Sequence, residues 1–259
     1  MNERVNYNKT SPVYNTRYQC NKMEGIEGFV EKLVVAKHPQ NILEIGCGTA
    51  HWLNTIASKY ECNLFGADYS IGMLNVAHSS NPKLNLANAD ANALPIKEST
   101  IDLIVVINAI HHFTNPLKFL RHAMHILKPN GILCIIGLEP RESKDNWFMY
   151  KYFTRTYEID INRFPTFEEI KSELMKTGLS EINIELVDKV NSRKMGRQIL
   201  TDHFANPEGA SQLALLSDEE YLLGRNKMIA DIEDAERKDK EIYFDVNLFF
   251  YALSCKKRI

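Results

Sequence analysis

A glycine-containing turn and the carboxylate that follows it carry the clearest chemical signal in this chain. Residues 43–50 read LEIGCGTA, so an apolar run passes directly into a turn with Gly46 and Gly48. A buried strand that turns at once into a helix, while a ligand approaches its backbone, needs residues without a Cβ there. Asp68 ends the next apolar run, where a carboxylate accepts hydrogen bonds from both hydroxyls of a ribose. The pattern predicts a nucleoside-binding cleft.

The turn lacks one feature of dinucleotide sites. Their GxGxxG fingerprint has a small residue three positions after the second glycine. His51 stands at that position, and Ala50 beside it does not restore the motif. Because a nucleoside without phosphates needs no anion cradle, the turn favours S-adenosylmethionine over NAD. A dehydrogenase is the less favoured alternative.

Over about residues 41–140, a series of segments resembles the class I S-adenosylmethionine-dependent methyltransferases of the methyltransferase type 11 group. The segments follow the order and spacing of that family: 44–50, 68–77 (DYSIGMLNVA), 89–95 (ADANALP), 101–106 (IDLIVV), 108–113 (NAIHHF) and 127–131 (LKPNG). Three positions depart from the family pattern, namely Ala50, Ile101 and Asn130. They affect turn geometry and remove no side-chain ligand.

The resemblance implies a fold, a cofactor and a set of binding residues. The fold is a Rossmann-like α/β arrangement, a mostly parallel seven-stranded sheet with helices on both faces and a helical lid-like insert. The cofactor is S-adenosyl-L-methionine, which leaves as S-adenosyl-L-homocysteine. The expected cofactor-binding residues are Tyr14, Arg17, Glu44, Gly46, Cys47, Gly48, Asp68, Tyr69, Met73, Asp90, Ala91 and Asn108.

Several of these residues have expected roles. The Asp90 carboxylate would accept a hydrogen bond from the adenine amino group, and the Ala91 backbone N–H would face the ring. In the family a tyrosine and an arginine close over the methionine moiety, which here implies Tyr14 and an ion pair from Arg17 to the cofactor's carboxylate. The alternative for Arg17 is an exposed side chain in a mobile tail.

His111 and His112 follow the fourth expected strand, at the rim where acceptor and methyl group would meet. A histidine with a pKa near neutrality is suited to remove a proton from an acceptor hydroxyl or ammonium. The alternative is that the pair lines the cofactor or caps a turn. Alternation across the strand end allows only one of the two side chains to point inward.

The other histidines favour structural roles. His122 and His125 lie three apart on an expected helix, with no Cys, Asp or Glu at ligand spacing, so a solvated helix face is favoured over a metal site. His51 is expected at a helix N-terminus beside the methionine end of the cofactor. We therefore predict no metal site.

The composition is that of an ordinary globular protein. The chain has 259 residues, 44% of them hydrophobic, with 31 basic and 33 acidic side chains. This balance predicts no nucleic-acid partner. The five cysteines are spread without a CxxC pair, as in a reduced, cytoplasmic protein. No apolar run approaches the roughly 20 residues of a membrane helix, and no leader sequence is visible, so no membrane partner is expected.

Hydrophobic periodicity predicts alternating helices and strands. An amphipathic helix is expected over 24–36, and another begins at Asn115-Pro116, a cap followed by proline. The expected strands are 41–45, 63–67, 84–88, 102–108, 131–138, 181–187 and 247–254. Such alternation implies a parallel sheet whose ligand cleft opens at the carboxyl ends of the strands.

Three regions are expected along the chain. Residues 1–40 form an N-terminal cap and helix, 41–140 the S-adenosylmethionine-binding core, and 141–259 a half that completes the sheet. Within the last, a capped helix begins near Thr166, and an insert at about 190–245 carries a helix starting near Asp218. The insert is expected to be either a lid over the acceptor pocket or an ordinary surface subdomain.

The favoured function is methyl transfer by in-line displacement to an O, N or C centre of a small-molecule acceptor, with alignment as the main contribution of the enzyme. The alternatives are an RNA or protein methyltransferase and a non-catalytic S-adenosylmethionine-binding protein. By location alone, the acceptor candidates are Tyr150, Tyr152, Tyr157 and His203. The identity of the acceptor and the oligomeric state are not predicted, because one fold serves many chemistries.

Overall fold

The predicted strands form one twisted sheet in a computed structural model, which describes residues 5–142, 144–177, 179 and 181–258. Within these residues the sheet has eight strands in the order β3-β2-β1-β4-β5-β8-β6, with β7 paired to β8. Their bounds are β1 Asn41–Ile45, β2 Asn63–Asp68, β3 Asn85–Asn88, β4 Ile101–Ile107, β5 Leu127–Gly137, β6 Asn146–Trp147, β7 Ile182–Met195 and β8 Tyr243–Lys256. The sequence predicted seven strands, because the two-residue β6 has no periodicity of its own and exists only through its pairing with β8.

The pairing of the strands divides the sheet into two parts. β1 to β5 pair in parallel, whereas β8 runs antiparallel to β5, β6 and β7. The parallel part therefore directs all its carboxyl ends to one edge, where ligands of open α/β sheets bind. This confirms the mixed α/β fold expected from the sequence.

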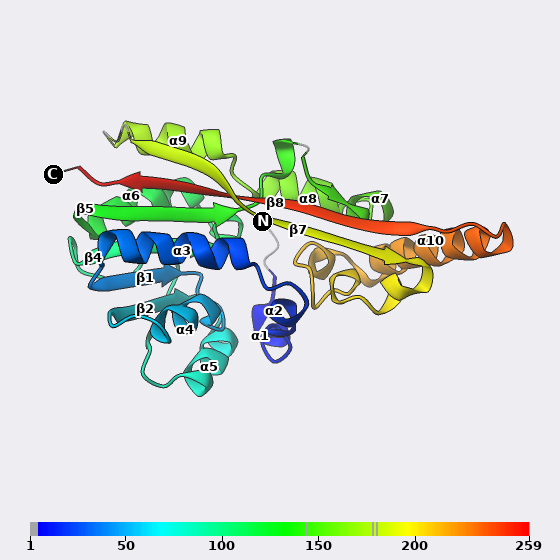
Figure 1. The fold of residues 1–259 in the computed structure, drawn as a ribbon, viewed down its shortest axis with the longest axis horizontal. Coiled ribbons are helices and arrows are strands. Elements are labelled where there is room, and N and C mark those ends of the chain that lie inside the picture. Colours follow the sequence, from blue (N-terminus) through cyan, green and yellow to red (C-terminus); the bar gives the residue numbers. More distant parts are fainter. Residues whose placement is uncertain (1–4, 143, 178, 180, 259) are drawn as a thin grey trace.

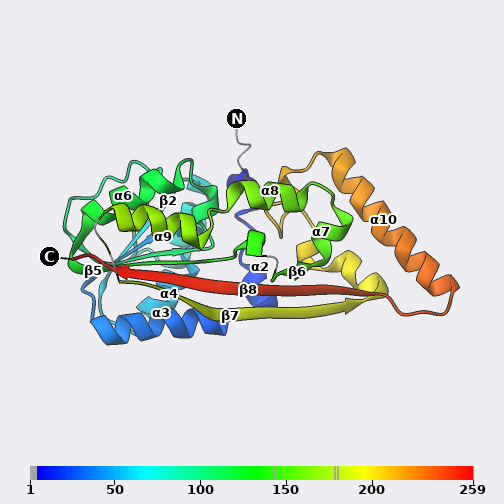
Figure 2. The ribbon, with the colours of Figure 1, turned by 90° about the horizontal axis from the view of Figure 1, so that it is seen from above.

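Helices cover both faces of the sheet (Figures 1 and 2). Alternate residues of the central strands enter two separate apolar clusters. Ile42, Leu103 and Val105 pack with α3 and α4 on one face, whereas Leu43, Ile104 and Val106 pack with α6 and α9 on the other. The helices are α1 Tyr7–Thr10, α2 Thr16–Cys20, α3 Glu24–Lys37, α4 His51–Ala57, α5 Ile71–Ser80, α6 Pro116–Ile126, α7 Phe148–Tyr152, α8 Thr156–Arg163, α9 Phe167–Lys176 and α10 Asp218–Arg237.

The predicted helix starts agree with the capping seen in the structure. Asn115 accepts a hydrogen bond from the Lys118 N–H and precedes Pro116 at the start of α6. Thr166 and Glu169 form a capping box at α9, and Ser217 and Glu220 form one at α10. These caps satisfy N–H groups that the first helical turn leaves without partners.

A long hairpin extends the sheet beyond the parallel strands. β7 and β8 have 14 residues each, and β8 pairs with β5 only from Tyr251, opposite Gly137, onward. The first eight residues of β8 therefore continue past the end of β5, roughly 27 Å of extended chain at 3.4 Å per residue. The insert lies at this far end (Figure 2) and spans 196–242, less than the expected 190–245, because both strands are longer than predicted.

The insert packs on the hairpin as part of one core. It contains the short 3-10 helices Gly196–Thr201, His203–Ala205 and Leu213–Leu215, followed by α10. Ile199, Met228 and Ile232 from the insert are buried in the same cluster as Phe244 and Val246 of β8. The hairpin and insert together therefore form a wall that rises from the sheet at the edge where the parallel strands end.

Candidate active site

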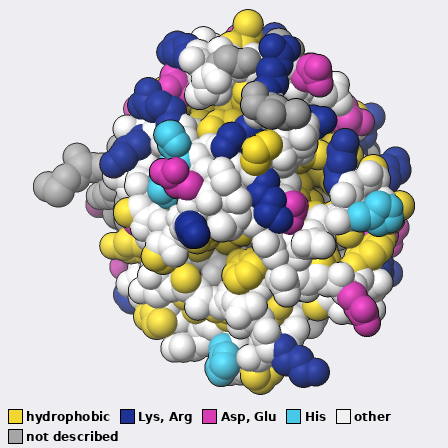
Figure 3. All heavy atoms as spheres, turned by 90° about the vertical axis from the view of Figure 1, so that its left-hand side faces the viewer, with side chains coloured by type: hydrophobic (Ala, Val, Ile, Leu, Met, Phe, Trp, Pro, Cys, Tyr) yellow, Lys and Arg dark blue, Asp and Glu magenta, His cyan; other side chains and the backbone are white. Residues whose placement is uncertain are grey.

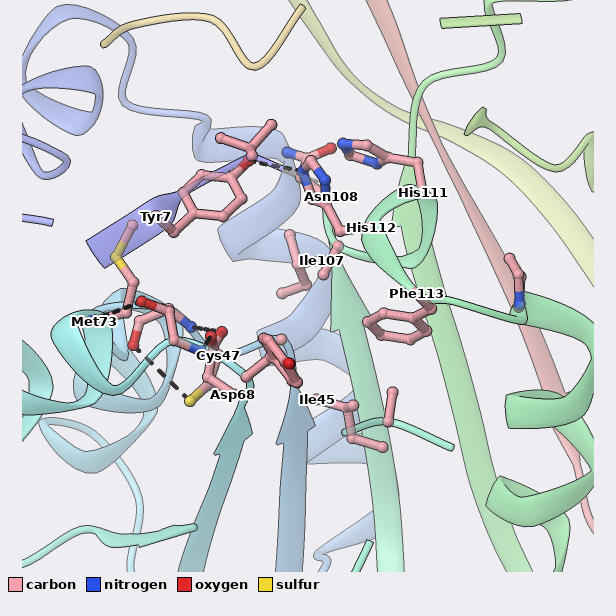
Figure 4. Close-up of a pocket in the computed structure, with 18 of the residues that line it drawn as sticks. Tyr7, Ile45, Cys47, Asp68, Met73, Ile107, Asn108, His111, His112 and Phe113 are labelled. Atoms are coloured by element: carbon pink, nitrogen blue, oxygen red, sulfur yellow. Dashed lines mark hydrogen bonds between the residues drawn. The ribbon is translucent and has the colours of Figure 1, made fainter. Parts of the chain in front are cut away.

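A large cavity lies at the carboxyl edge of the parallel strands, where the sequence predicted the cleft (Figure 4). Its volume is about 1110 Å³. Its walls come from the ends of β1, β2 and β4, from the N-terminal cap, which we define as residues 5–20, and from α8 with the turn after it. All twelve residues expected to bind the cofactor line this cavity.

The glycine turn is built as its residue types require. Gly46 and Gly48 have φ of 70° and 53°, conformations that glycine adopts without steric cost. A Cβ on Gly46 would lie 2.4 Å from the Cβ of Ala109, so no side chain fits there. Ala50, the departure from the family pattern that lies in this turn, also has positive φ, at 59°. The turn thus brings backbone against the floor of the cavity.

Asp68 connects this turn to the second strand. Its Oδ2 accepts a hydrogen bond from the Gly48 N–H at 2.8 Å, and its Oδ1 accepts one from the Ser70 N–H at 2.8 Å. Burial raises the pKa of the carboxyl, and the backbone N–H donors oppose that rise. The carboxylate is therefore held in a fixed orientation at the cavity wall.

Glu44 is the most deeply buried acid of the site, with 1% of its surface exposed. Burial raises its pKa well above the usual range, and the nearby charge of Asp68 adds to the effect. Its Oε2 has no hydrogen-bond partner among the described residues. A buried carboxylate oxygen without a partner is costly, so this position suits a ligand that brings a cation or a hydrogen-bond donor.

Asp90, Ala91, Met73 and Tyr69 belong to the same end of the cavity, whereas Asn108 lies beside the two histidines (Figure 4). Asp90 Oδ1 accepts from the Asn92 N–H at 2.8 Å, which fixes the carboxyl beside Ala91. Met73 is buried below the cavity, and Tyr69 stands at its rim with 67% of its surface exposed. Asn108 has φ of 50°, and its N–H donates to the carbonyl of Ile136.

The N-terminal cap is anchored over this end. Asn8 Oδ1 accepts hydrogen bonds from Ser70 Oγ and the Gly72 N–H, each at 2.8 Å, and Thr49 Oγ1 donates to Asn15 Oδ1 at 2.6 Å. Arg17 lies on α2 and donates from Nη1 to the Tyr14 hydroxyl at 2.6 Å. Arg17 therefore lines the cavity, which is not the exposed tail position of the alternative interpretation.

Both His111 and His112 line the cavity, so the expectation that only one points inward is wrong. The chain leaves the strand direction after Ile107 and forms a 3-10 turn over Ile110–His112, so strand alternation no longer applies. Figure 4 shows both rings at the upper end of the cavity, opposite Asp68. Sequence periodicity did not indicate this turn.

Each histidine has its own partner. His112 Nε2 lies 2.7 Å from the Tyr7 hydroxyl, and the ring of His111 stacks on Phe164 with centroids 3.9 Å apart. Burial lowers the pKa of both imidazoles well below the usual value, and the charges of Arg163 and Arg17 add to this. Both rings are therefore neutral at pH 7, the form that accepts a proton.

The acceptor candidates chosen by location do not lie in the cavity wall. Tyr150, Tyr152, Tyr157 and His203 are absent from the lining formed by the described residues. In their place stand Tyr7, Arg163 and Phe164, which sequence reasoning missed. For Arg163 the sequence offered one signal. Asp160 and Arg163 are three positions apart, the spacing of an ion pair on one helix turn, which the structure contains.

A smaller cavity of about 80 Å³ continues from the histidines toward the hairpin. Its wall includes Val246, Leu248 and Phe250 of β8 and Trp147 of β6. The buried face of the long hairpin therefore contributes an apolar surface next to the two imidazoles.

The other sequence expectations concern histidines and membranes. His51 stacks on Tyr18, with ring centroids 3.6 Å apart. It is not one of the described residues that line the cavity. Within the described part of the chain there is no group of three or more His, Cys, Asp or Glu placed to hold a metal ion. Nor does any helix there have the length and apolar character needed to cross a membrane.

Comparisons with known proteins agree with this geometry. Residues 43–135 match the family model described as Methyltransferase domain. The tRNA (carboxymethyluridine(34)-5-O)-methyltransferase of Saccharomyces cerevisiae is 30% identical over 92 residues, which cover 34% of this chain and 32% of that protein. A ubiquinone/menaquinone biosynthesis C-methyltransferase of Campylobacter jejuni is 30% identical over 112 residues, covering 41% and 48%. The chain thus spans about a third to a half of the length of these two relatives.

A solved structure extends the similarity over most of the fold. The putative methyltransferase from an antibiotic biosynthesis pathway of Anabaena variabilis has a TM-score of 0.64 at 20% identity, covering 86% of this chain and 95% of that one. The sheet and the glycine turn define the class I, S-adenosylmethionine-dependent methyltransferase fold. Within this fold, residues 43–135 are the part of the chain that matches the methyltransferase family model.

Proposed function

We propose that this protein transfers a methyl group from S-adenosyl-L-methionine to an O, N or C centre of a small-molecule acceptor. The observation that carries the proposal is one cavity that joins the glycine turn and Asp68 at one end to His111 and His112 at the other. Its volume of about 1110 Å³ exceeds the ~300–1,000 Å³ of a typical single-ligand site. There is room for the cofactor and a small acceptor together.

The acidic end of the cavity suits the cofactor. The Asp68 carboxylate, oriented by the Gly48 and Ser70 N–H groups, would hold the ribose hydroxyls. The unpartnered Oε2 of Glu44 would face the positive charge of the methionine end. Asp90 and Ala91 would hold the adenine. Arg17 with Tyr14, which lie toward the histidines, would hold the carboxylate of the cofactor. When bound there, S-adenosylmethionine supplies an electrophilic methyl group.

At the other end, His111 and His112 would act on the acceptor. Their lowered pKa values keep both imidazoles neutral and make each a weaker base than a solvated histidine. Either would accept a hydrogen bond, and then the proton, from an acceptor that becomes more acidic as it is methylated. The Tyr7 hydroxyl fixes the His112 ring, and Phe164 fixes the ring of His111. Such fixed geometry is the main contribution expected for a displacement that needs no covalent enzyme intermediate.

The N-terminal cap and the hairpin wall would keep water from the reacting atoms. The cap is joined to the cofactor end through Asn8 and Asn15, and the apolar side of β8 forms the far wall of the smaller cavity. An acceptor placed between them would be surrounded by Trp147, Phe250 and the two imidazoles. Such a pocket fits a compact molecule with an apolar body.

One relative and one surface view also bear on the acceptor. The name of the Campylobacter relative gives a small-molecule pathway, the biosynthesis of ubiquinone and menaquinone. The yeast relative acts on tRNA and is the basis of the second candidate, an RNA methyltransferase. On the face seen in Figure 3, basic, acidic and apolar side chains are interspersed, unlike the continuous basic surface that collects phosphate backbones.

The test is transfer of labelled methyl groups from S-adenosylmethionine into a fractionated cell extract, with calorimetric titration of the cofactor in parallel. Label in the small-molecule fraction supports the proposal and supplies a product for mass spectrometry. Label in RNA or protein would replace it with the second candidate. Cofactor binding without any labelled fraction would favour a non-catalytic role.

A further inference from the structure

Arg163 is a cation placed at the acceptor end of the main cavity. It is the last residue of α8, lines the cavity, and has 11% of its side chain exposed. Its Nη2 donates to Asp160 Oδ1 at 2.8 Å and to Ser211 Oγ at 3.1 Å. One nitrogen of the guanidinium is therefore fully used in holding the group in place.

The anchor of this guanidinium is itself rigid. The Asp160 side chain is completely buried, and its Oδ2 accepts from the Tyr150 hydroxyl at 2.9 Å and from Gln212 Nε2 at 2.6 Å. These donors come from α7 and from the insert, so three separate segments meet at one carboxylate. Burial raises the pKa of Asp160, and the Arg163 charge and the three donors oppose that rise.

The rest of the guanidinium has no partner within the residues that the structure describes. Nε and Nη1 of Arg163 are buried, and neither has a hydrogen-bond partner among the described residues. Together they carry three N–H bonds. Buried donors in native proteins are almost always paired, and a guanidinium is suited to pair with carboxylate or phosphate oxygens. These donors therefore face an acceptor oxygen that the described residues do not supply.

Acidic and basic side chains line opposite ends of the cavity. Glu44, Asp68 and Asp90 lie at the cofactor end, whereas Arg17 and Arg163 lie near the two histidines. Arg141 also lines the cavity, and it pairs with Glu169. S-Adenosylmethionine brings a sulfonium to the acidic end. At the basic end, Arg17 would take the single carboxylate of the cofactor. Arg163 is paired with Asp160, but its Nε and Nη1 donors stay available for a further acceptor.

We propose that the methyl acceptor carries an anionic oxygen group, a carboxylate or a phosphate, which binds Arg163. The inference rests on the proposed function and names the chemistry of its acceptor. Asp160 acts as a positioning residue, because it orients the guanidinium and does not touch the acceptor. The ring stack of His111 on Phe164 lies next to this cation and would hold the apolar body of the same molecule.

The first experiment separates a metabolite extract on an anion-exchange resin before the methyl-transfer assay. We expect the acceptor in the retained, anionic fraction. Arg163→Met should slow transfer at low acceptor concentration about tenfold or more, through a higher KM, and leave the affinity for S-adenosylmethionine unchanged. The matched control is Arg237→Met, because Arg237 is an exposed residue of α10 paired with Asp234. An acceptor in the unretained fraction would overturn the proposal.

The second experiment does not depend on catalysis. Protein loaded with S-adenosylhomocysteine is titrated with a panel of small aromatic carboxylates and phosphates and with their uncharged amide or alcohol counterparts. The anions should bind more tightly than their counterparts, and the difference should disappear in the Asp160→Asn/Arg163→Met double variant. That variant removes both members of the buried pair, so no unpaired charge destabilises the fold.

The two experiments separate failure of the function from failure of the inference. If the cofactor binds but no fraction is labelled in the transfer assay, the proposed function is contradicted. The titration then tests, independently of methyl transfer, whether Arg163 binds anions. Equal binding of anions and neutral counterparts, or no binding across the panel, would overturn the assignment of Arg163. Arg163→Lys keeps the charge near Asp160 and should restore part of the preference, which a purely structural role would not produce.

Discussion

The hydroxyl of Tyr7 lies 2.7 Å from Nε2 of His112, although 105 positions separate the two residues in sequence. Their rings also meet edge to face, with centroids 5.1 Å apart. The contact joins the N-terminal cap to the turn after β4, directly above the cavity. It makes the orientation of one candidate base dependent on the closure of the cap.

Tyr7→Phe removes this hydrogen bond and keeps the ring. We expect methyl transfer to slow by about two- to tenfold, which corresponds to one hydrogen bond of ~0.5–1.5 kcal/mol. The affinity for S-adenosylmethionine should change little, because Tyr7 contacts the histidine end. Steady-state kinetics beside cofactor titration measures both. A loss confined to cofactor affinity would contradict the role given to Tyr7.

Asp68→Asn tests the ribose assignment. Loss of the carboxylate should weaken S-adenosylmethionine binding by roughly 10- to 150-fold, the equivalent of ~1.5–3 kcal/mol for a charged hydrogen-bond acceptor. Asp102→Asn is the matched control, since Asp102 likewise accepts from a backbone N–H, that of Asn41 at 2.9 Å, but at the opposite edge of the sheet. Undiminished affinity in Asp68→Asn would refute the assignment.

The pH dependence of the rate follows from the buried histidines. Burial lowers the pKa of His111 and of His112 well below 6.5, so the neutral, proton-accepting form is already complete at neutral pH. A lowered pKa means that activity rises with pH only in the acid range and is then constant. We expect a flat profile of kcat from about pH 6.5 to pH 8. A histidine-like inflection near pH 6.5 would show that the base is a solvated group.

Asp145 should reduce stability at neutral pH. Its Oδ1 accepts from the Phe249 N–H at 2.8 Å, and its Oδ2 is buried with no partner in the described part of the chain. Burial raises its pKa from 3.8 to about 6. Between these values the unfolded chain releases the proton while the folded chain keeps it, so stability falls as pH rises.

Asp145→Asn removes this titration and keeps the Oδ1 acceptor. Relative to the wild type, the variant should gain stability between pH 4 and pH 6 and stay more stable above, by about 1–2 kcal/mol after allowance for partial solvent screening. Urea unfolding at pH 4, 6 and 8 measures the difference. A constant difference over this range would mean that Asp145 does not titrate as described.

Phe244→Ala tests whether the hairpin and insert belong to the main core. Phe244 is 1% exposed and packs against Phe148 and Tyr152. Its truncation should cost about 3–5 kcal/mol of the free energy of unfolding. Leu223→Ala on α10 is the control, because that side chain is 68% exposed and its loss should cost under ~0.5 kcal/mol. A separate, early unfolding transition in the wild type would show instead an independent subdomain.

Elements whose cause lies in their own residues were predicted from the sequence, and elements that depend on a distant partner were not. The five strands of the parallel part were predicted within a few residues. The central ones, β1 and β4, are short apolar runs, and β5 contains one after its polar start. The ends of the long hairpin were missed. Residues 188–195 (DKVNSRKM) are mostly polar and partly exposed, and they are a strand only because each pairs with a residue of β8.

By itself the sequence determined the class of fold, the edge of the sheet where the cleft lies, and the acidic residues at one end of the cavity. These follow from local causes, namely glycines that alone adopt the turn at Gly46 and polar residues such as Asp68 that end apolar strands. Only the tertiary structure decided what stands opposite them. Tyr7 and Arg163 lie near the histidines because segments distant in sequence fold back to the same edge of the sheet. No pattern along the chain predicts these contacts.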